Sequence, residues 1–180
     1  MKRFPEKTAL ISSALTTLAI VNSWAVVVYL HNFPGLIKQL SVLEVLIILA
    51  YVLFSALVES LVIFIILTAL SALLPPRMLR SAFSVRSGIF LQLFTLYIVP
   101  FHTYIPRITT LIFEPTVTIF IAAWTVIFIV EILLFHMIVQ RYPKFNQKAE
   151  AVFDRVSVLG TIYLVLDLIS SGIVLIANWK

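Results

Sequence analysis

Long apolar runs alternate with short polar stretches along the sequence. A helix needs about 17–25 mostly apolar residues to cross a bilayer, because every backbone polar group in lipid must be hydrogen-bonded within the segment. Five apolar runs reach this length. The pattern therefore predicts five transmembrane helices, which cover residues 8–30, 42–74, 89–105, 116–139 and 156–178.

Prolines mark where these helices are expected to end or bend. Pro75-Pro76 follows the second run and cannot continue a helix, and Pro100 is expected to kink the third. Between the first two runs, residues 31–41 contain Pro34-Gly35, which predicts a turn in a short connection. No long polar segment separates the runs, so we expect a single all-α membrane domain over residues 1–180.

Composition agrees with this pattern. Of the 180 residues, 62% are hydrophobic and 12% are charged, whereas soluble domains average roughly 45–50% apolar and 25% charged residues. The formal charge is +5, but the Lys and Arg residues sit in short segments beside the apolar runs, where they report orientation and not nucleic-acid binding. The absence of cysteine from the sequence excludes disulfides and Cys-ligated metal sites.

The segments between the runs differ in charge. Three basic segments, at residues 1–7, 75–88 and 140–155, alternate with near-neutral segments at 31–41 and 106–115. Lys and Arg concentrate in cytoplasmic loops, so we predict a multi-pass protein of the cell membrane with its N-terminus in the cytoplasm and its C-terminus outside. The basic side chains of the second basic segment can also contact anionic lipid head groups; they are Arg77, Arg80 and Arg86.

Three carboxylates lie inside the predicted spans: Glu59, Glu131 and Asp167. An ionisable group at the centre of a span costs about 2.5–3.5 kcal/mol or more, so each of them needs a compensating contact. No Lys or Arg lies inside a span, but Asn22 falls at a similar depth. Helical rise places the four side chains in a layer on the order of 5–6 Å deep. We therefore expect a buried polar layer in which Glu59 is the neighbour of Asp167.

Helical spacing indicates which way these side chains point. The positions three, four and seven residues from Asp167 carry mainly small or polar side chains, which is typical of a helix–helix interface. They include Gly160, Tyr163, Ser170 and Ser171. Small residues also accompany Glu59, whereas Glu131 lies among bulky apolar side chains. We therefore expect Asp167 and Glu59 to face protein.

Several functions are compatible with such a layer. In a structural role, neutral carboxyl groups hydrogen-bond to neighbouring polar side chains and hold the bundle together, because desolvation disfavours the charged form. In a complex subunit, another membrane protein supplies the counter-charge. In a transporter or channel, Glu59, Glu131 and Asp167 bind and release a proton or a cation. We expect a structural or complex-subunit role, with transport as the alternative.

Catalysis has the least support in the sequence. There is no H-E-x-x-H pair for zinc and no G-x-S-x-G nucleophile turn, so an intramembrane enzyme is not expected. His102 and His136 lie near opposite faces of the membrane, so they are too far apart to share a metal or haem. We expect no catalytic, metal or cofactor-binding residues, and we expect membrane lipid as a partner. The sequence leaves open whether a lipid, pigment or haem fills the bundle.

Overall fold

The chain is helical throughout the part that the structure describes. The computed structural model describes residues 5–73, 82–108 and 115–179, and it describes their side chains except at 99–108 and 115–117. Its five helices are α1 (Lys7–Gln39), α2 (Val42–Leu73), α3 (Phe83–Ile108), α4 (Pro115–Arg141) and α5 (Pro143–Ala177). The predicted all-α class is confirmed.

Four of these helices are long and apolar enough to cross a membrane, namely α1, α2, α4 from Thr118 onward, and α5. The described apolar part of α3, Phe83–Ile98, is shorter. With 33 residues, α1 is about 50 Å long at 1.5 Å per residue, which exceeds a hydrocarbon core of about 30 Å. A helix of this length must tilt in a bilayer or project beyond it.

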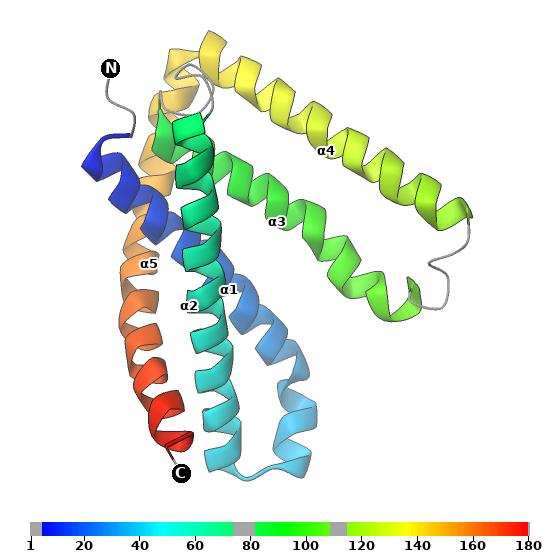
Figure 1. Ribbon diagram of the computed structural model, residues 1–180, viewed down its shortest axis with the longest axis vertical. Helices are drawn as coiled ribbons and strands as arrows, with labels where there is room; N and C mark the ends of the chain where they lie inside the picture. Colours follow the sequence, from blue (N-terminus) through cyan, green and yellow to red (C-terminus); the bar gives the residue numbers. More distant parts are fainter. Residues whose placement is uncertain (1–4, 74–81, 109–114, 180) are drawn as a thin grey trace.

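The helices form a core and a side arm (Figure 1). In the core, α1 crosses between α2 and α5 and packs against both of them. Helix α3 leaves this core at an angle, and α4 runs beside α3 to return to the first turns of α5. The most apolar 18-residue stretch of α4 contains no buried residue. We refer to α3 and α4 together as the α3–α4 arm.

Small and polar side chains make the core compact. A Cβ atom at Gly160 of α5 would overlap the backbone carbonyl of Leu15 in α1, so only glycine fits where these helices cross. The buried face of α1 includes Ser13, Thr17 and Ala19. Lipid tails are as apolar as leucine side chains, so membrane helices associate mainly through close backbone approach and hydrogen bonds. The buried residues of the core fit that rule.

The first connection differs from the prediction for residues 31–41. Helix α1 continues through Pro34-Gly35 and ends at Gln39, where the Leu40 N–H donates to the Leu36 carbonyl over 3.0 Å. Gly35 has neither a positive φ nor a neighbour that a side chain would strike, so nothing there demands a turn. Pro34 removes only one intrahelical hydrogen bond, because it lacks an N–H, and the remaining bonds carry the helix onward.

The turn itself is built by the first residues of α2. The Ser41 backbone N–H and hydroxyl both donate to Glu44 Oε2 over 2.8 Å, and the Glu44 N–H donates to Ser41 Oγ over 3.4 Å. This reciprocal arrangement is a capping box, which satisfies backbone donors that the first helical turn would otherwise leave unpaired. The S-x-x-E pattern at Ser41–Glu44 therefore places the helix start.

Two other helices begin earlier than their apolar runs. Helix α5 begins at Pro143 and not at residue 156, and α3 begins at Phe83 and not at 89. Proline is favoured in the first helical turn because its missing N–H has no partner there in any case. The predicted boundaries followed the apolar residues, whereas the helices continue into polar sequence.

Candidate functional site

Asp167 of α5 and Asn22 of α1 meet at the centre of the core. Asn22 Nδ2 donates to Asp167 Oδ2 over 3.1 Å and also to the Leu18 carbonyl over 3.1 Å. Both residues have 0% of their surface exposed. Asp167 shares its buried face of α5 with Gly160 and Ser170, at the spacing that the sequence indicated. The structure therefore brings two of the four residues of the expected polar layer into contact.

The amide oxygen of Asn22 and the second carboxyl oxygen of Asp167 have no hydrogen-bond partner among the described residues. These atoms, Asn22 Oδ1 and Asp167 Oδ1, are buried and can only accept a hydrogen bond when the carboxyl group is ionised. A neutral carboxylic acid supplies one O–H donor, which an ionised carboxylate lacks. Since burying an unpaired charge is far more costly than burying a neutral hydrogen-bonded group, the pair suits an acid–amide contact.

The hydroxyl groups near Asp167 bond elsewhere. Ser171 Oγ donates to the backbone carbonyl of Asp167 over 2.7 Å, and so leaves the carboxyl group alone. Tyr163 lies one turn away and accepts a hydrogen bond from Ser23 Oγ at 3.4 Å. Ser170 is buried on the same face as Asp167. These residues extend the polar contact along the helices, but these hydrogen bonds do not reach the carboxyl oxygens of Asp167.

Four polar contacts join residues 12–23 of α1 to residues 153–167 of α5, and we call this set of contacts the polar seam. They join Ser12 to Asp154 (3.3 Å), Thr16 to the Phe153 carbonyl (3.4 Å), Ser23 to Tyr163 (3.4 Å) and Asn22 to Asp167 (3.1 Å). Three of them involve residues that the sequence analysis did not single out. Hydroxyl side chains at 12, 16 and 23 follow helical spacing on α1, and that periodicity is the signal that could have found them.

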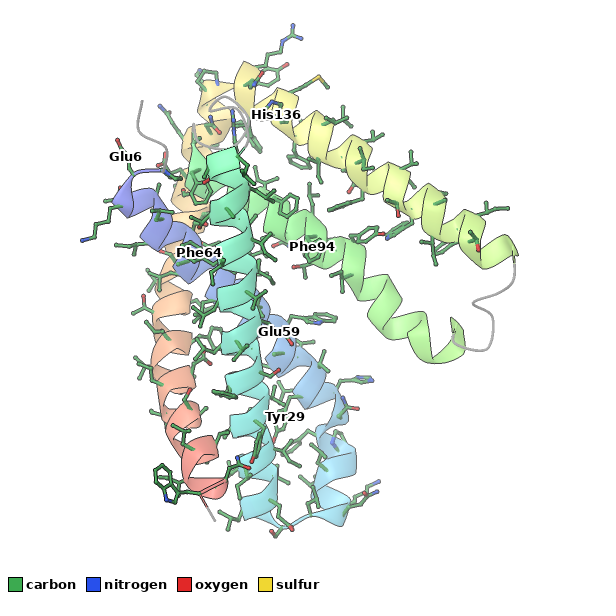
Figure 2. The ribbon with its side chains drawn as sticks, viewed as in Figure 1. Glu6, Tyr29, Glu59, Phe64, Phe94 and His136 are labelled. Atoms are coloured by element: carbon green, nitrogen blue, oxygen red, sulfur yellow. The ribbon has the colours of Figure 1, made fainter. Side chains whose placement is uncertain are left out.

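Glu59 lies apart from this pair, contrary to expectation. It is exposed on α2, where its Oε1 accepts a hydrogen bond from Ser55 Oγ at 3.5 Å, and it lines a groove that does not include Asp167 (Figure 2). The buried face of α2 contains Ala56 and Ser60. Glu59 lies three residues after Ala56 and one residue before Ser60. When α2 is rotated so that these two small residues face the core, the Glu59 side chain points to one side of that face.

Glu131 is also separate from Asp167. It is exposed on α4, which lies in the side arm and not in the core. The three carboxylates therefore do not form the single layer expected from their depth, because only Asp167 is buried. Similar depth stays a prediction, and depth does not determine which helices are neighbours.

Of the three arginine residues proposed to contact lipid, the structure describes Arg86, which lies in the first turns of α3. Arg77 and Arg80 lie outside the described residues. Arg86 is partly buried in α3 and borders an apolar cavity of about 180 Å³ between α2, α3 and α4, together with His136. His136 Nε2 lies 3.0 Å from Gln140 Nε2 within α4. Lipid head-group contact by these arginines stays a prediction.

No family model, curated protein or solved structure matches the chain in the comparisons made with each of these three sets. Its function must therefore be argued from the arrangement of its own side chains.

Proposed function

We propose that this protein is a subunit of a membrane-protein complex, in which the core anchors the chain and the α3–α4 arm binds a transmembrane helix of another chain. The observation that carries this proposal is the exposed carboxylate of Glu131 on α4. Exposed apolar side chains alone would suit lipid. A carboxylate near the middle of a membrane-crossing helix does not, because it costs about 2.5–3.5 kcal/mol or more there.

The arm is held together from within. The Trp124 indole N–H of α4 donates to the Tyr97 carbonyl of α3 over 3.2 Å, and the Tyr97 and Thr125 hydroxyl oxygens lie 2.9 Å apart. The ring of Phe128 lies 6.3 Å from that of Phe94, which adds an aromatic contact. These contacts involve residues 124–128 of α4. Glu131 follows Phe128 by three residues on the same side of the helix and is exposed, so a partner helix can reach it beyond these contacts.

The partner is expected to be a helix with a Lys or Arg at the depth of Glu131. Ile127 and Leu134 flank Glu131 at helical spacing and are about half exposed, at 48% and 47%. They offer an apolar surface on both sides of the charge. An opposite charge from another chain would offset the desolvation of Glu131, whereas no Lys or Arg of this chain lies within the apolar part of α4.

The proposed placement has five membrane crossings, with the N-terminus in the cytoplasm and the cell membrane as the location. With 26 residues, α3 is about 39 Å long, which is sufficient for a crossing. Glu6, Phe83 and Glu150 border one shared pocket, so the first turns of α1, α3 and α5 lie at the same end of the molecule. The described parts of the basic segments, residues 5–7, 82–88 and 140–155, lie at or next to this end, which supports its assignment to the cytoplasmic side.

A transport role for Asp167 has less support. Its carboxyl group is fully enclosed between α1 and α5, so an ion could reach it only if these helices separated. Gly160 packs against the α1 backbone on the same face, which opposes such a separation. The polar seam is better suited to holding the two helices together.

Site-specific photo-crosslinking tests the proposal. A photoreactive amino acid at Ile127 or Leu134 is expected to form a cross-link to one defined membrane protein, in cells that express the full chain at its native level. The matched control places the same group at Leu168 of α5, which is 62% exposed and lies outside the arm. The cross-linked peptide of the partner is then identified by mass spectrometry, and it must come from a transmembrane segment with a Lys or Arg. Cross-links to lipid alone at both α4 positions would contradict the proposal.

A further inference from the structure

A groove of about 510 Å³ opens between α1, α2 and α3, on the side of the core that faces the arm. Its wall is mainly aliphatic and aromatic, with Trp24 from α1 and Phe94 from α3 among the lining residues. Glu59 of α2 lines the same groove, and Figure 2 shows it along α2 between the levels of Phe94 and Tyr29. The described lining residues include no Lys, Arg or His. The groove therefore combines an apolar wall with one carboxylate.

Three other polar side chains of the groove, Tyr29, Asn32 and Thr95, donate hydrogen bonds to the backbone. The Tyr29 hydroxyl donates to the Val45 carbonyl over 3.1 Å, Asn32 Nδ2 donates to the Val28 carbonyl over 2.8 Å, and Thr95 Oγ1 donates to the Leu91 carbonyl over 2.9 Å. Each of these bonds has ordinary length.

Glu59 has a weaker partner than these side chains. Its bond from Ser55 Oγ spans 3.5 Å, whereas O–H···O hydrogen bonds usually span about 2.5–3.0 Å. The Glu59 carboxylate therefore has a longer and weaker hydrogen bond than Tyr29, Asn32 and Thr95 have. Because Glu59 lies near the middle of α2, a carboxylate with such weak hydrogen bonding is costly in a bilayer.

An apolar wall with one carboxylate suits a ligand that combines a positive charge with apolar groups. A carboxylate beside aromatic rings attracts organic cations through both ion pairing and cation–π contact. A volume of about 510 Å³ lies within the range of roughly 300–1,000 Å³ of small-molecule sites. A hydrated metal ion fits less well, since hard cations require about six oxygen ligands and no group of three or more His, Cys, Asp or Glu residues in the described structure could hold a metal.

We infer that this groove binds a hydrophobic monovalent cation, with its charged centre on Glu59 and its apolar body between α1 and α3. The ligand class is that of lipophilic amines and quaternary ammonium or phosphonium compounds. The site is separate from the surface around Glu131, so the inference does not depend on the proposed partner of the α3–α4 arm.

Binding of labelled tetraphenylphosphonium to the purified full chain in lipid nanodiscs tests this inference by equilibrium dialysis, with empty nanodiscs as the background. We expect saturable binding of one cation per chain. Tetraphenylborate has the same shape and the opposite charge, and we expect it not to compete. Glu59→Gln should weaken binding at least tenfold, whereas Glu150→Gln removes another exposed carboxylate outside the groove and should leave binding unchanged.

A second variant keeps the test decisive if Glu59→Gln does not fold. Ala25 lines the groove, so Ala25→Phe narrows it while Glu59 is retained, and we expect at least a tenfold loss of affinity. Unchanged binding in either folded variant would overturn the inference, as would equal binding of tetraphenylborate. A transmembrane segment of another protein that cross-links to the groove and blocks tetraphenylphosphonium would also overturn it.

Discussion

Asn22 and Asp167 bring four polar side-chain atoms into a space closed to the surroundings, and a hydrogen bond of 3.1 Å joins the two side chains. Their remaining oxygens face no donor among the described residues. At the scale of the residue, this hydrogen-bonded pair holds α1 and α5 together. Its chemistry favours a neutral carboxyl group. A neutral side chain with a hydrogen-bond donor is therefore expected to replace Asp167.

Asp167→Asn is expected to retain the unfolding free energy of the wild type to within about 1 kcal/mol, because the amide supplies both a donor and an acceptor to Asn22. Asp167→Ala should lower it by about 1–3 kcal/mol, since Asn22 is then buried without its partner. Unfolding by SDS titration in mixed micelles measures both values. An equally large loss in the Asn and Ala variants would show that the fold needs the ionised carboxylate.

Sequence reasoning identified Asn22 and Asp167 but also grouped Glu59 and Glu131 with them. Position within an apolar run gives the depth of a side chain, and helical spacing gives the residues that share its face. Neither gives the rotation of one helix against its neighbours. For Asp167 the face is clearly small and polar, whereas Glu59 lies at the edge of a small-residue face and turns aside.

At the scale of the element, the crossing of α1 and α5 depends on a missing side chain. A Cβ atom at Gly160 would overlap backbone atoms of Leu15 in α1. Backbone atoms cannot move out of the way as the end of a flexible side chain can. Gly172 lies farther along the same helix and has nothing within 4 Å of an added Cβ atom. The two glycines therefore form a matched pair in one helix.

Gly160→Ala is expected to lower the unfolding free energy by about 1–3 kcal/mol, because an added methyl group forces α1 and α5 apart. Gly172→Ala should leave it unchanged or raise it by up to about 1 kcal/mol, since alanine favours the helix. SDS titration of both variants checks this difference. Equal effects of the two substitutions would mean that α1 and α5 do not cross at Gly160.

The start of a helix can be predicted where the sequence contains a specific capping motif. It is predicted less well where only the apolar composition of a segment indicates the helix. The S-x-x-E pattern at Ser41–Glu44 specifies the start of α2 because the two side chains cap each other's backbone. Pro34-Gly35 misled the prediction because proline disfavours a helix without prohibiting it. The early start of α5 at Pro143 could not be predicted from the length of the apolar run, since the first turns of this helix are polar.

At the scale of the whole molecule, the structure separates a packed core from a side arm (Figure 1). Composition and periodicity predicted the class and the order of the helices. They did not predict that α1, α2 and α5 would form the core, because apolar faces attract one another with similar strength in lipid. Contacts such as Gly160 on Leu15 and Asn22 on Asp167 decide the arrangement, and each is visible only when the helices are assembled.

The arm gives the proposed function its central claim, which is that Glu131 forms an ion pair with a transmembrane helix of another chain. Charge exchange tests this claim most directly, once cross-linking at Ile127 or Leu134 has identified the partner. Glu131→Lys should abolish co-purification of the complex in mild detergent, and replacement of the partner's intramembrane Lys or Arg by Glu should restore it. A complex that survives Glu131→Lys unchanged, or that the exchange does not restore, would contradict the account.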